Sequence, residues 1–178
     1  MISLSIIIPV FNCADTLGRA LKSIPVSDNK LKINIIIIDD CSTDDYKNLL
    51  SNFSNKNITY YRNQRSLGPG LSRNIGIAKA SSKYVCFLDA DDEFEKSFFK
   101  FIYDIASKNQ HLSTIQFNSS DLILNSENGD IQIQERKSIP MPGNLDSNYL
   151  VRLFKGEIPC ECWQLVYDLE FLRKSKIS

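Results

Sequence analysis

A short apolar run leads directly into a cluster of carboxylates in the stretch Tyr84-Val85-Cys86-Phe87-Leu88-Asp89-Ala90-Asp91-Asp92. Apolar runs of this length are typical of buried strands. A strand that ends in carboxylates presents them at the rim of a sheet, where open α/β folds bind their ligands. Such a cluster attracts a cation, and hard oxygen ligands suit Mg²⁺ or Mn²⁺ bound to the phosphates of a substrate. The stretch therefore suggests a metal-assisted site, although Asp-x-Asp by itself is common and favours a simpler interpretation, the acidic start of a solvated helix.

Three more apolar runs precede this stretch, at residues 4–10, 33–38 and 58–61. Between the runs, apolar side chains recur at the spacing of one helix face, and Asp15 is expected to cap the first of these helices. The three faces consist of Leu17, Ala20, Leu21 and Ile24, then Tyr46, Leu49, Leu50 and Phe53, then Leu71, Ile75 and Ala78. This alternation predicts an α/β fold, a mostly parallel sheet flanked by helices.

Polar residues fall at the predicted ends of these strands, namely Asn12, Asp39, Asp40, Asp89 and Asp91. The carboxyl ends of parallel strands lie at one edge of the sheet, and open α/β sheets bind ligands there. The coincidence of these residues is a stronger signal than any single motif.

The pattern changes after residue 112. Before that point, Phe98, Phe101, Ile102 and Ile105 form a helical stripe that indicates core packing. Beyond it, short strands are expected at residues 115–117, 122–124 and 131–133, the last two joined by a turn at Asn128-Gly129-Asp130. An exposed loop at residues 138–144 and a helix carrying Leu150, Val151 and Phe154 are expected to follow.

Composition excludes some classes of protein. Lys plus Arg and Asp plus Glu both number 21, and this balance argues against a dedicated nucleic-acid binder. The five cysteines are scattered, and the lone His111 gives no zinc spacing with Cys160-x-Cys162, so we expect thiols in a reducing compartment. Met1 leads into the first strand without a basic segment, and the apolar runs are too short to cross a bilayer. A cytoplasmic protein is expected, with peripheral membrane contact left open.

Four motifs in order, at this spacing, resemble glycosyltransferase family 2. They are Ile7-Ile8-Pro9-Val10-Phe11-Asn12, Ile38-Asp39-Asp40-Cys41-Ser42-Thr43-Asp44, Gly68-Pro69-Gly70-Leu71-Ser72-Arg73-Asn74-Ile75-Gly76 and Phe87-Leu88-Asp89-Ala90-Asp91-Asp92. The resemblance is dense over the first two-thirds of the chain, with a weaker match at Cys162-Trp163-Gln164-Leu165-Val166-Tyr167. It implies the A-type nucleotide-sugar transferase fold (GT-A).

The resemblance also implies where a nucleotide would bind. By analogy, Pro9-Val10-Phe11-Asn12 would line the base and ribose. Asp40 would accept a hydrogen bond from a uracil-like edge, with Asp39 or Ser42 supporting the loop. A simpler interpretation is that Asp39 and Asp40 cap the following helix.

Further along the chain, Gly68 would let the backbone approach the ligand closely. Arg73 would meet the base or the phosphates, unless it is an ordinary solvated arginine after a turn. Asp89 would lie near the ribose and the metal, with Ala90 beside the nucleotide, and Asp91 would ligate the metal directly.

The implied function is a metal-dependent, inverting transfer of a sugar from a nucleotide-diphosphate donor, UDP-linked by this analogy. The acceptor would be a glycan or a lipid-linked sugar in bacterial surface polysaccharide synthesis, at the inner face of the cell membrane. Residues 1–112 would bind the donor, and residues 113–178 would form part of an acceptor side within one continuous domain.

Inverting transfer needs a catalytic carboxylate, which the family usually places beyond the region matching Trp163 to Tyr167, as an acidic pair. No such pair follows here, and Glu157 and Glu161 lack the expected context. We therefore expect the base to lie beyond Ser178, in which case this chain binds donor but transfers poorly. The alternative function is a truncated or inactive nucleotide-sugar-binding module.

Two unrelated classes also place acids at strand ends. A phosphoacceptor signalling domain needs acids after the first strand, which here ends in Asn12. A phosphatase of the haloacid dehalogenase type needs Asp-x-Asp after its first strand, followed by Thr or Val, whereas position 93 is Glu. Both classes rank far below the transferase.

Overall fold

The structure is a computed structural model that describes residues 1–109, 113–116, 119–124, 131–136 and 165–174. The chain divides into two compact units, one of Met1–Ile115 with Val166–Ser178 and one of Gln116–Leu165. The first unit contains every predicted site residue.

A six-stranded sheet in the order β3-β2-β1-β4-β8-β5 organises the chain. Its first four strands in this order are mutually parallel, and β8 pairs antiparallel with β4. The strands are β1 (Ile2–Val10), β2 (Leu31–Asp39), β3 (Ile58–Arg62), β4 (Tyr84–Phe87), β5 (Thr114–Gln116) and β8 (Leu165–Asp168). The predicted α/β class with a mostly parallel sheet is confirmed.

β1 and β2 are apolar almost throughout because helices cover both faces of the sheet. Ile6, Ile8 and Ile37 are fully buried. Each such side chain contributes about 1.5–3 kcal/mol relative to leaving it in water. The pairing of Val10 with Asp39, and of Asp39 with Arg62, brings the carboxyl ends of β1, β2 and β3 level with one another.

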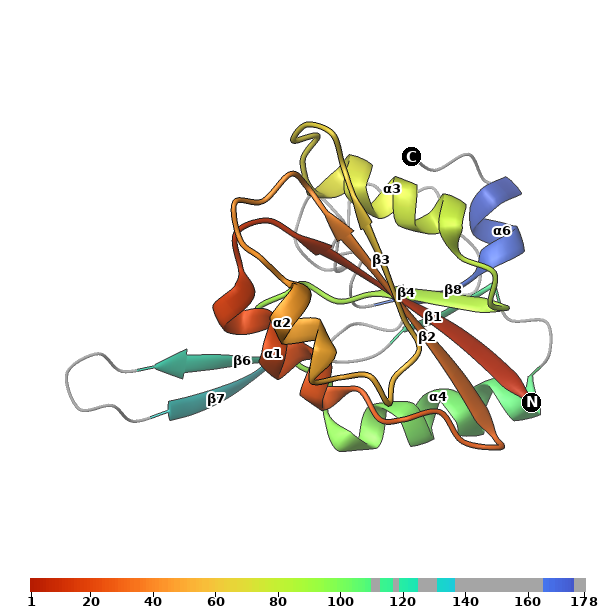
Figure 1. Ribbon diagram of the computed structural model, residues 1–178. Helices are drawn as coiled ribbons and strands as arrows, with labels where there is room; N and C mark the ends of the chain where they lie inside the picture. Colours follow the sequence, from red (N-terminus) through yellow and green to blue (C-terminus); the bar gives the residue numbers. More distant parts are fainter. Residues whose placement is uncertain (110–112, 117–118, 125–130, 137–164, 175–178) are drawn as a thin grey trace, which may run out of the picture. The chain divides into compact units, whose positions relative to one another are not determined.

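The helices divide between the two faces of this sheet (Figure 1). α3 (Pro69–Lys79) and α6 (Leu169–Lys174) lie on one side, while α1 (Ala14–Ser23), α2 (Lys47–Ser51) and α4 (Lys96–Lys108) lie on the other. Right-handed crossovers require this arrangement, because the chain runs outward from β1 to β3 and then returns past β1 to β4. The direction therefore reverses between β1 and β4, where open α/β sheets place their ligand crevice.

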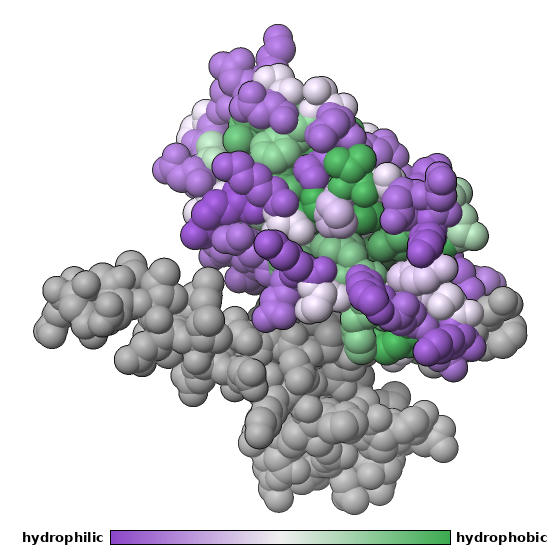
Figure 2. Space-filling view, turned by 90° about the horizontal axis from the view of Figure 1, so that it is seen from below, coloured by the Kyte–Doolittle hydropathy of each residue, from purple (hydrophilic) through white to green (hydrophobic). Residues whose placement is uncertain are grey.

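Figure 2 views the molecule from the side on which α1, α2 and α4 lie. This surface is mainly hydrophilic, with a smaller group of apolar side chains in its middle. The sequence of α1 explains such a surface, since its buried residues Leu17, Ala20 and Leu21 alternate with exposed charges such as Arg19 and Lys22. An amphipathic helix of this kind turns one stripe to the core and the rest to water.

The helices differ from the sequence-based expectation in several details. α2 covers only Lys47–Ser51, so Tyr46 and Phe53 of its expected face lie outside it. α1 begins after Cys13, and Asp15 lies in its first turn instead of capping it. The buried residues of α3 are Ser72 and Gly76, whereas Leu71 is 53% exposed. The expected face of Leu71, Ile75 and Ala78 was therefore wrong, because a helix that lies close to a sheet presents its smallest side chains to it.

Gly76 sets the distance between α3 and the sheet. A Cβ atom added at this position would meet Ile7 Cγ2 of β1 at 2.4 Å, well inside van der Waals contact. α3 can therefore pack directly on β1 only because residue 76 has no side chain.

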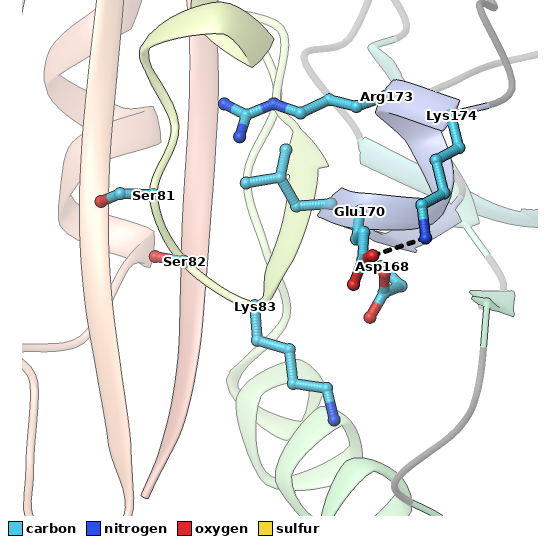
Figure 3. Close-up of a pocket in the computed structure, with 8 residues that line it drawn as sticks. Ser81, Ser82, Lys83, Asp168, Glu170, Arg173 and Lys174 are labelled. Carbon is cyan, nitrogen blue, oxygen red and sulfur yellow. Dashed lines mark ion pairs between the residues drawn. The ribbon is translucent and has the colours of Figure 1, made fainter.

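α6 holds the carboxyl end of α3 through hydrogen bonds from Arg173. Arg173 donates hydrogen bonds from Nη2 to the carbonyl oxygens of Ile77 at 2.9 Å and Ala80 at 2.8 Å. Figure 3 shows Arg173 reaching away from α6, while Lys174 pairs with Glu170 on the same helix. The hollow between them, of about 650 Å³, also borders Ser82. Two of its three cations, Arg173 and Lys174, thus already have partners within the fold.

The second unit contains a hairpin. β6 (Ser119–Leu124) pairs antiparallel with β7 (Ile131–Arg136), from Ser119 opposite Arg136 to Leu124 opposite Ile131. This confirms the predicted strands at residues 122–124 and 131–133. The expected turn at residues 128–130, the loop at 138–144, the helix around Leu150 and the cysteines Cys160 and Cys162 lie outside the described residues. None of the described helices is long and apolar enough to cross a membrane.

Replacement of Gly76 tests whether α3 packs against β1 as closely as the structure indicates. Alanine gains about 1 kcal/mol of helix propensity over glycine, but overpacking a core costs about 1–3 kcal/mol or more. We expect Gly76→Ala to lower the free energy of unfolding in urea by about 1–2 kcal/mol. Gly70→Ala, in the same helix with open space around it, should be neutral or stabilising. Equal effects of the two substitutions would contradict this account, and Ile7→Ala should relieve the clash in the double variant.

Candidate nucleotide-sugar site

A cavity of about 640 Å³ lies where β1, β2 and β4 have their carboxyl ends. It brings together every predicted site residue except Asp39, namely Pro9, Val10, Phe11, Asn12, Asp40, Gly68, Arg73, Asp89, Ala90 and Asp91. The lining residues that sequence reasoning missed are Cys13, Asp15, Thr16, Ser66 and Pro69. Most of them are neighbours of the recognised motifs in the chain, which is the signal that could have found them.

The loops after β1 and β2 hold each other in place. Asn12 Oδ1 accepts hydrogen bonds from the Thr43 backbone N–H at 2.7 Å and from Thr43 Oγ1 at 3.0 Å, and the Asn12 N–H donates to Ser42 Oγ at 3.0 Å. Asn12 and Cys41 both have positive φ, at 49° and 67°. Such conformations are costly for residues with a side chain and persist only where the surroundings enforce them. Asn12 therefore acts mainly as a bridge between the loops.

Asp39 supports this bridge from below and does not reach the cavity. Its side chain is fully buried, and its Oδ1 accepts a hydrogen bond from the Ser42 backbone N–H at 2.8 Å. Tyr60 donates its hydroxyl hydrogen to Asp39 Oδ2, and Arg62 Nε lies 3.7 Å from the same oxygen. These contacts fit the supporting role expected for Asp39, and its contact with a nucleotide stays a prediction.

Asp40 is the anchor of the loop that leads into α3. Its Oδ1 accepts hydrogen bonds from Asn63 Nδ2 at 2.8 Å, the Leu67 backbone N–H at 2.8 Å and Ser72 Oγ at 3.2 Å. Its Oδ2 accepts from Ser66 Oγ at 2.7 Å and the Gly68 backbone N–H at 2.8 Å. A bond to the N–H of a base would join or replace members of this set, and that contact stays a prediction.

These donors determine the charge of Asp40. Burial by itself would raise the pKa of this carboxyl group, but hydrogen bonds from Leu67, Asn63, Ser66 and Gly68 outweigh burial and lower the pKa well below its usual range. Asp40 is therefore ionised throughout the physiological range. Gly68, at φ 85°, turns the backbone so that its N–H reaches the carboxylate just before α3 begins.

Arg73, on the second turn of α3, forms an ion pair across the cavity. Its Nη2 lies 2.5 Å from Asp89 Oδ1, and 19% of the Arg73 side chain and 31% of the Asp89 side chain are exposed. The Nε of Arg73 is buried and has no hydrogen-bond partner among the described residues. An unpaired buried donor costs about 1–3 kcal/mol, so the present partners of Arg73 do not satisfy it fully.

The acidic loop after β4 is tied to α1. Arg19 Nη2 donates to the Asp91 carbonyl oxygen at 3.4 Å, its Nε lies 3.8 Å from Glu93 Oε1, and the Phe94 N–H donates to Ser23 Oγ at 3.0 Å. These contacts fix the position of the loop that carries the two predicted metal ligands.

Asp89 and Asp91 supply the carboxylates that a divalent cation would require. Across the described residues, no group of three or more His, Cys, Asp or Glu side chains is placed to hold a metal ion. Two carboxylates fit Mg²⁺ or Mn²⁺ in sites where substrate phosphates and water complete the coordination shell. The donor set is thus suited to a cation shared with a diphosphate.

Tyr46, beneath the loops, was predicted only as part of an apolar helix face. Its hydroxyl oxygen accepts a hydrogen bond from the Cys13 N–H at 3.1 Å and lies 3.2 Å from Ser42 Oγ. Burial raises the pKa of Tyr46 to about 12, so the phenol stays neutral. Burial likewise raises the pKa of the Cys13 thiol, which makes Cys13 a poor nucleophile.

Substitution of Asp40 by Asn tests its role as an anchor. The amide group cannot accept all of these bonds, and we expect a loss of about 3 kcal/mol in unfolding free energy at pH 7. Because the pKa of Asp40 is lower in the folded state, its stabilisation is present above the unfolded-state value of about 3.9 and is lost as the pH falls below it. Denaturation curves from pH 7 to pH 3 should show the gap between wild type and Asp40→Asn beginning to narrow below about pH 4, without closing, because the folded-state pKa of Asp40 lies lower still.

The matched control for this experiment is Asp15→Asn, which replaces an exposed carboxylate of α1. Its effect should be small over the whole range of pH. A gap between wild type and Asp40→Asn that stays constant down to pH 3 would contradict the anchoring role.

Comparisons with known proteins agree with this geometry. The family model described as Glycosyl transferase family 2 matches residues 5–143. Over 96 residues the chain is 42% identical to the GalNAc(5)-diNAcBac-PP-undecaprenol beta-1,3-glucosyltransferase of Campylobacter jejuni, a match covering 52% of this chain and 31% of that protein. Over 103 residues it is 31% identical to the poly(ribitol-phosphate) beta-N-acetylglucosaminyltransferase TarS of Staphylococcus aureus, covering 56% and 18%. The chain thus spans about a third or less of the length of these relatives.

The same fold occurs in a solved structure. The crystal structure of S. aureus TarS 1–349 in complex with UDP-GlcNAc superposes with a TM-score of 0.66 at 19% identity, covering 99% of this chain and 48% of that one. This likeness confirms the GT-A architecture expected from the sequence. By the match of its residues 5–143, the chain belongs to glycosyl transferase family 2.

Proposed function

We propose that this chain provides the donor site of a metal-dependent, inverting glycosyltransferase that uses a UDP-linked sugar. The observation that carries the proposal is that one cavity combines the exposed ring of Phe11, the guanidinium group of Arg73 and the carboxylates of Asp89 and Asp91. A nucleotide-diphosphate sugar requires this combination, because it has a planar base, a doubly charged diphosphate and a bond that breaks with charge on the leaving group.

We propose that the nucleobase of the donor stacks on the ring of Phe11. Phe11 follows β1, lines the cavity and is 54% exposed, so its ring is open to a ligand there. A base stacked on an aromatic ring gains favourable contact whatever its hydrogen-bonding edge. Pro9 and Val10 would complete the wall behind the base and ribose.

Arg73 and the start of α3 are proposed to face the diphosphate. The helix begins at Pro69 after Gly68, and both residues line the cavity. The amino end of a helix favours anions, and a guanidinium group binds phosphate oxygens with good geometry.

Asp89 and Asp91 would hold Mn²⁺ or Mg²⁺. When bound, such a cation would neutralise the charge that develops on the leaving diphosphate. The residues of the chain contribute by fixing the two carboxylates on a loop braced by Arg19 and Ser23.

The named activities of the relatives support the choice of donor and acceptor. One relative is a glucosyltransferase acting on an undecaprenol-linked saccharide, and the solved TarS structure contains UDP-GlcNAc. We therefore propose a hexose or N-acetylhexosamine donor and a glycan or lipid-linked acceptor in bacterial surface polysaccharide synthesis. A lipid-linked acceptor would place the reaction at the inner face of the cell membrane.

Ligand-induced stabilisation tests the donor site. UDP or a UDP-sugar with Mn²⁺ should raise the melting temperature, because a ligand at 100 times its Kd adds about 2.7 kcal/mol to the stability. Asp91→Asn should abolish the part that depends on Mn²⁺. Glu93→Gln, in the same loop but outside the cavity lining, is the matched control and should respond like wild type. The absence of stabilisation by any nucleotide diphosphate with metal would refute the proposal, and donor binding without sugar transfer would favour the binding-module alternative.

Substitution of Phe11 tests whether the nucleobase stacks on its ring. Stacking on an aromatic side chain contributes about 1–3 kcal/mol per base, so Phe11→Ala should weaken UDP binding by roughly 5- to 150-fold in calorimetric titration. Leu71→Ala removes an equally exposed apolar side chain, at 53%, that does not line the cavity. Equal losses in both variants would show that the ring has no specific role.

A further inference from the structure

The ion pair of Arg73 and Asp89 links the two halves of the proposed donor site. Asp89 is one of the two predicted metal ligands, and Arg73 Nη2 lies 2.5 Å from its Oδ1. The guanidinium group thus neutralises a carboxylate that a cation would otherwise bind. Of these two predicted ligands, a divalent ion that approaches alone meets only the carboxylate of Asp91 outside the ion pair, and it does so next to a positive charge.

The chain offers little else to such an ion. Within the described residues, the acids, histidines and cysteines form no cluster of three that could hold a metal. Mg²⁺ and Mn²⁺ prefer several oxygen ligands, and a diphosphate would supply those that the two aspartates do not.

The hydrogen-bond donors of Arg73 are also not all paired with the residues that the structure describes. Its Nε is buried and lacks an acceptor in the part of the chain that the structure describes. Diphosphate oxygens in the cavity would offer the guanidinium group anionic acceptors in place of Asp89, and a turn of the Arg73 side chain away from Asp89 would expose Nε to them. The cavity lining includes Arg73, Asp89 and Asp91 together, so a ligand in the cavity would meet all three side chains.

We propose that Arg73 is the resident counter-ion of Asp89 and sets the order of assembly, so that a divalent cation binds with the nucleoside diphosphate and not before it. The inference rests on the proposed function and concerns the regulation of that site. It predicts a strong, reciprocal coupling, in which each of the two ligands raises the affinity for the other by the same factor.

Binding of Mn²⁺ to the full chain, measured by electron paramagnetic resonance with and without UDP, tests the proposal. Wild type should bind Mn²⁺ weakly alone and much more tightly with UDP. In Arg73→Gln, the affinity for Mn²⁺ alone should rise by roughly tenfold, because a unit positive charge beside the ion is removed. The coupling to UDP should shrink correspondingly. Arg73→Lys keeps the charge and should keep the weak binding.

Arg19→Gln is the matched control, because Arg19 contacts the same acidic loop through the Asp91 carbonyl oxygen and Glu93 but does not pair with Asp89. It should change the affinity for Mn²⁺ by less than about twofold. Far-ultraviolet circular dichroism verifies that each variant is folded.

The results separate two kinds of failure. If Mn²⁺ alone binds Arg73→Gln no better than wild type, while UDP still promotes Mn²⁺ binding to wild type, the counter-ion role is wrong and the donor site stands. If UDP promotes no Mn²⁺ binding to any of these proteins, the proposed metal and nucleotide site is itself wrong, and the inference is refuted with it.

Discussion

β1 is paired with a parallel strand on each side, and each segment of the candidate site is attached to this three-stranded unit. The chain reaches β2 and β3 through α1 and α2 on one face and returns to β4 by way of α3 on the other, so none of these three helices crosses the gap between the ends of β1 and β4. That gap accommodates Phe11, Arg73 and the acidic loop. Parallel pairing makes the convergence unavoidable, because it places all carboxyl ends at one edge.

The buried charge of Asp40 then gives the edge its shape. A carboxylate that is 4% exposed must be fully hydrogen-bonded, and its donors come from the loop that starts at Asn63 and ends in the first turns of α3. The loop is therefore held to β2 by one ionised group. Since Arg73 follows that loop directly, the position of the guanidinium group depends on Asp40 as well as on α3. Asp39, the neighbour of Asp40, holds the loop after β2 in a similar way, by accepting a hydrogen bond from the Ser42 backbone N–H.

Charge balance distinguishes the two sides of the cavity. The α3 side brings a helix amino end and Arg73, while the β4 side brings Asp89 and Asp91. In the structure these sides neutralise each other through one ion pair. A ligand that carries both a dianion and a cation matches the two sides at once, whereas either ion alone disturbs the pair. This complementarity is the physical basis for treating the nucleotide diphosphate and its metal as one ligand.

The sequence by itself determined the order and type of the strands, since runs such as Ile35 to Ile38 are apolar without alternation and have no other stable place than a sheet covered on both faces. It also determined which residues gather at the site, because motifs at strand ends meet wherever the strands are parallel. Only the tertiary structure decided that α3 turns Ser72 and Gly76 inward, since the required side-chain size depends on how closely the helix approaches Ile7. It likewise decided that Asp40 anchors a loop, that Tyr46 lies beneath the site and that Arg73 pairs with Asp89. Those roles arise from contacts between residues distant in the chain, and no local pattern records them.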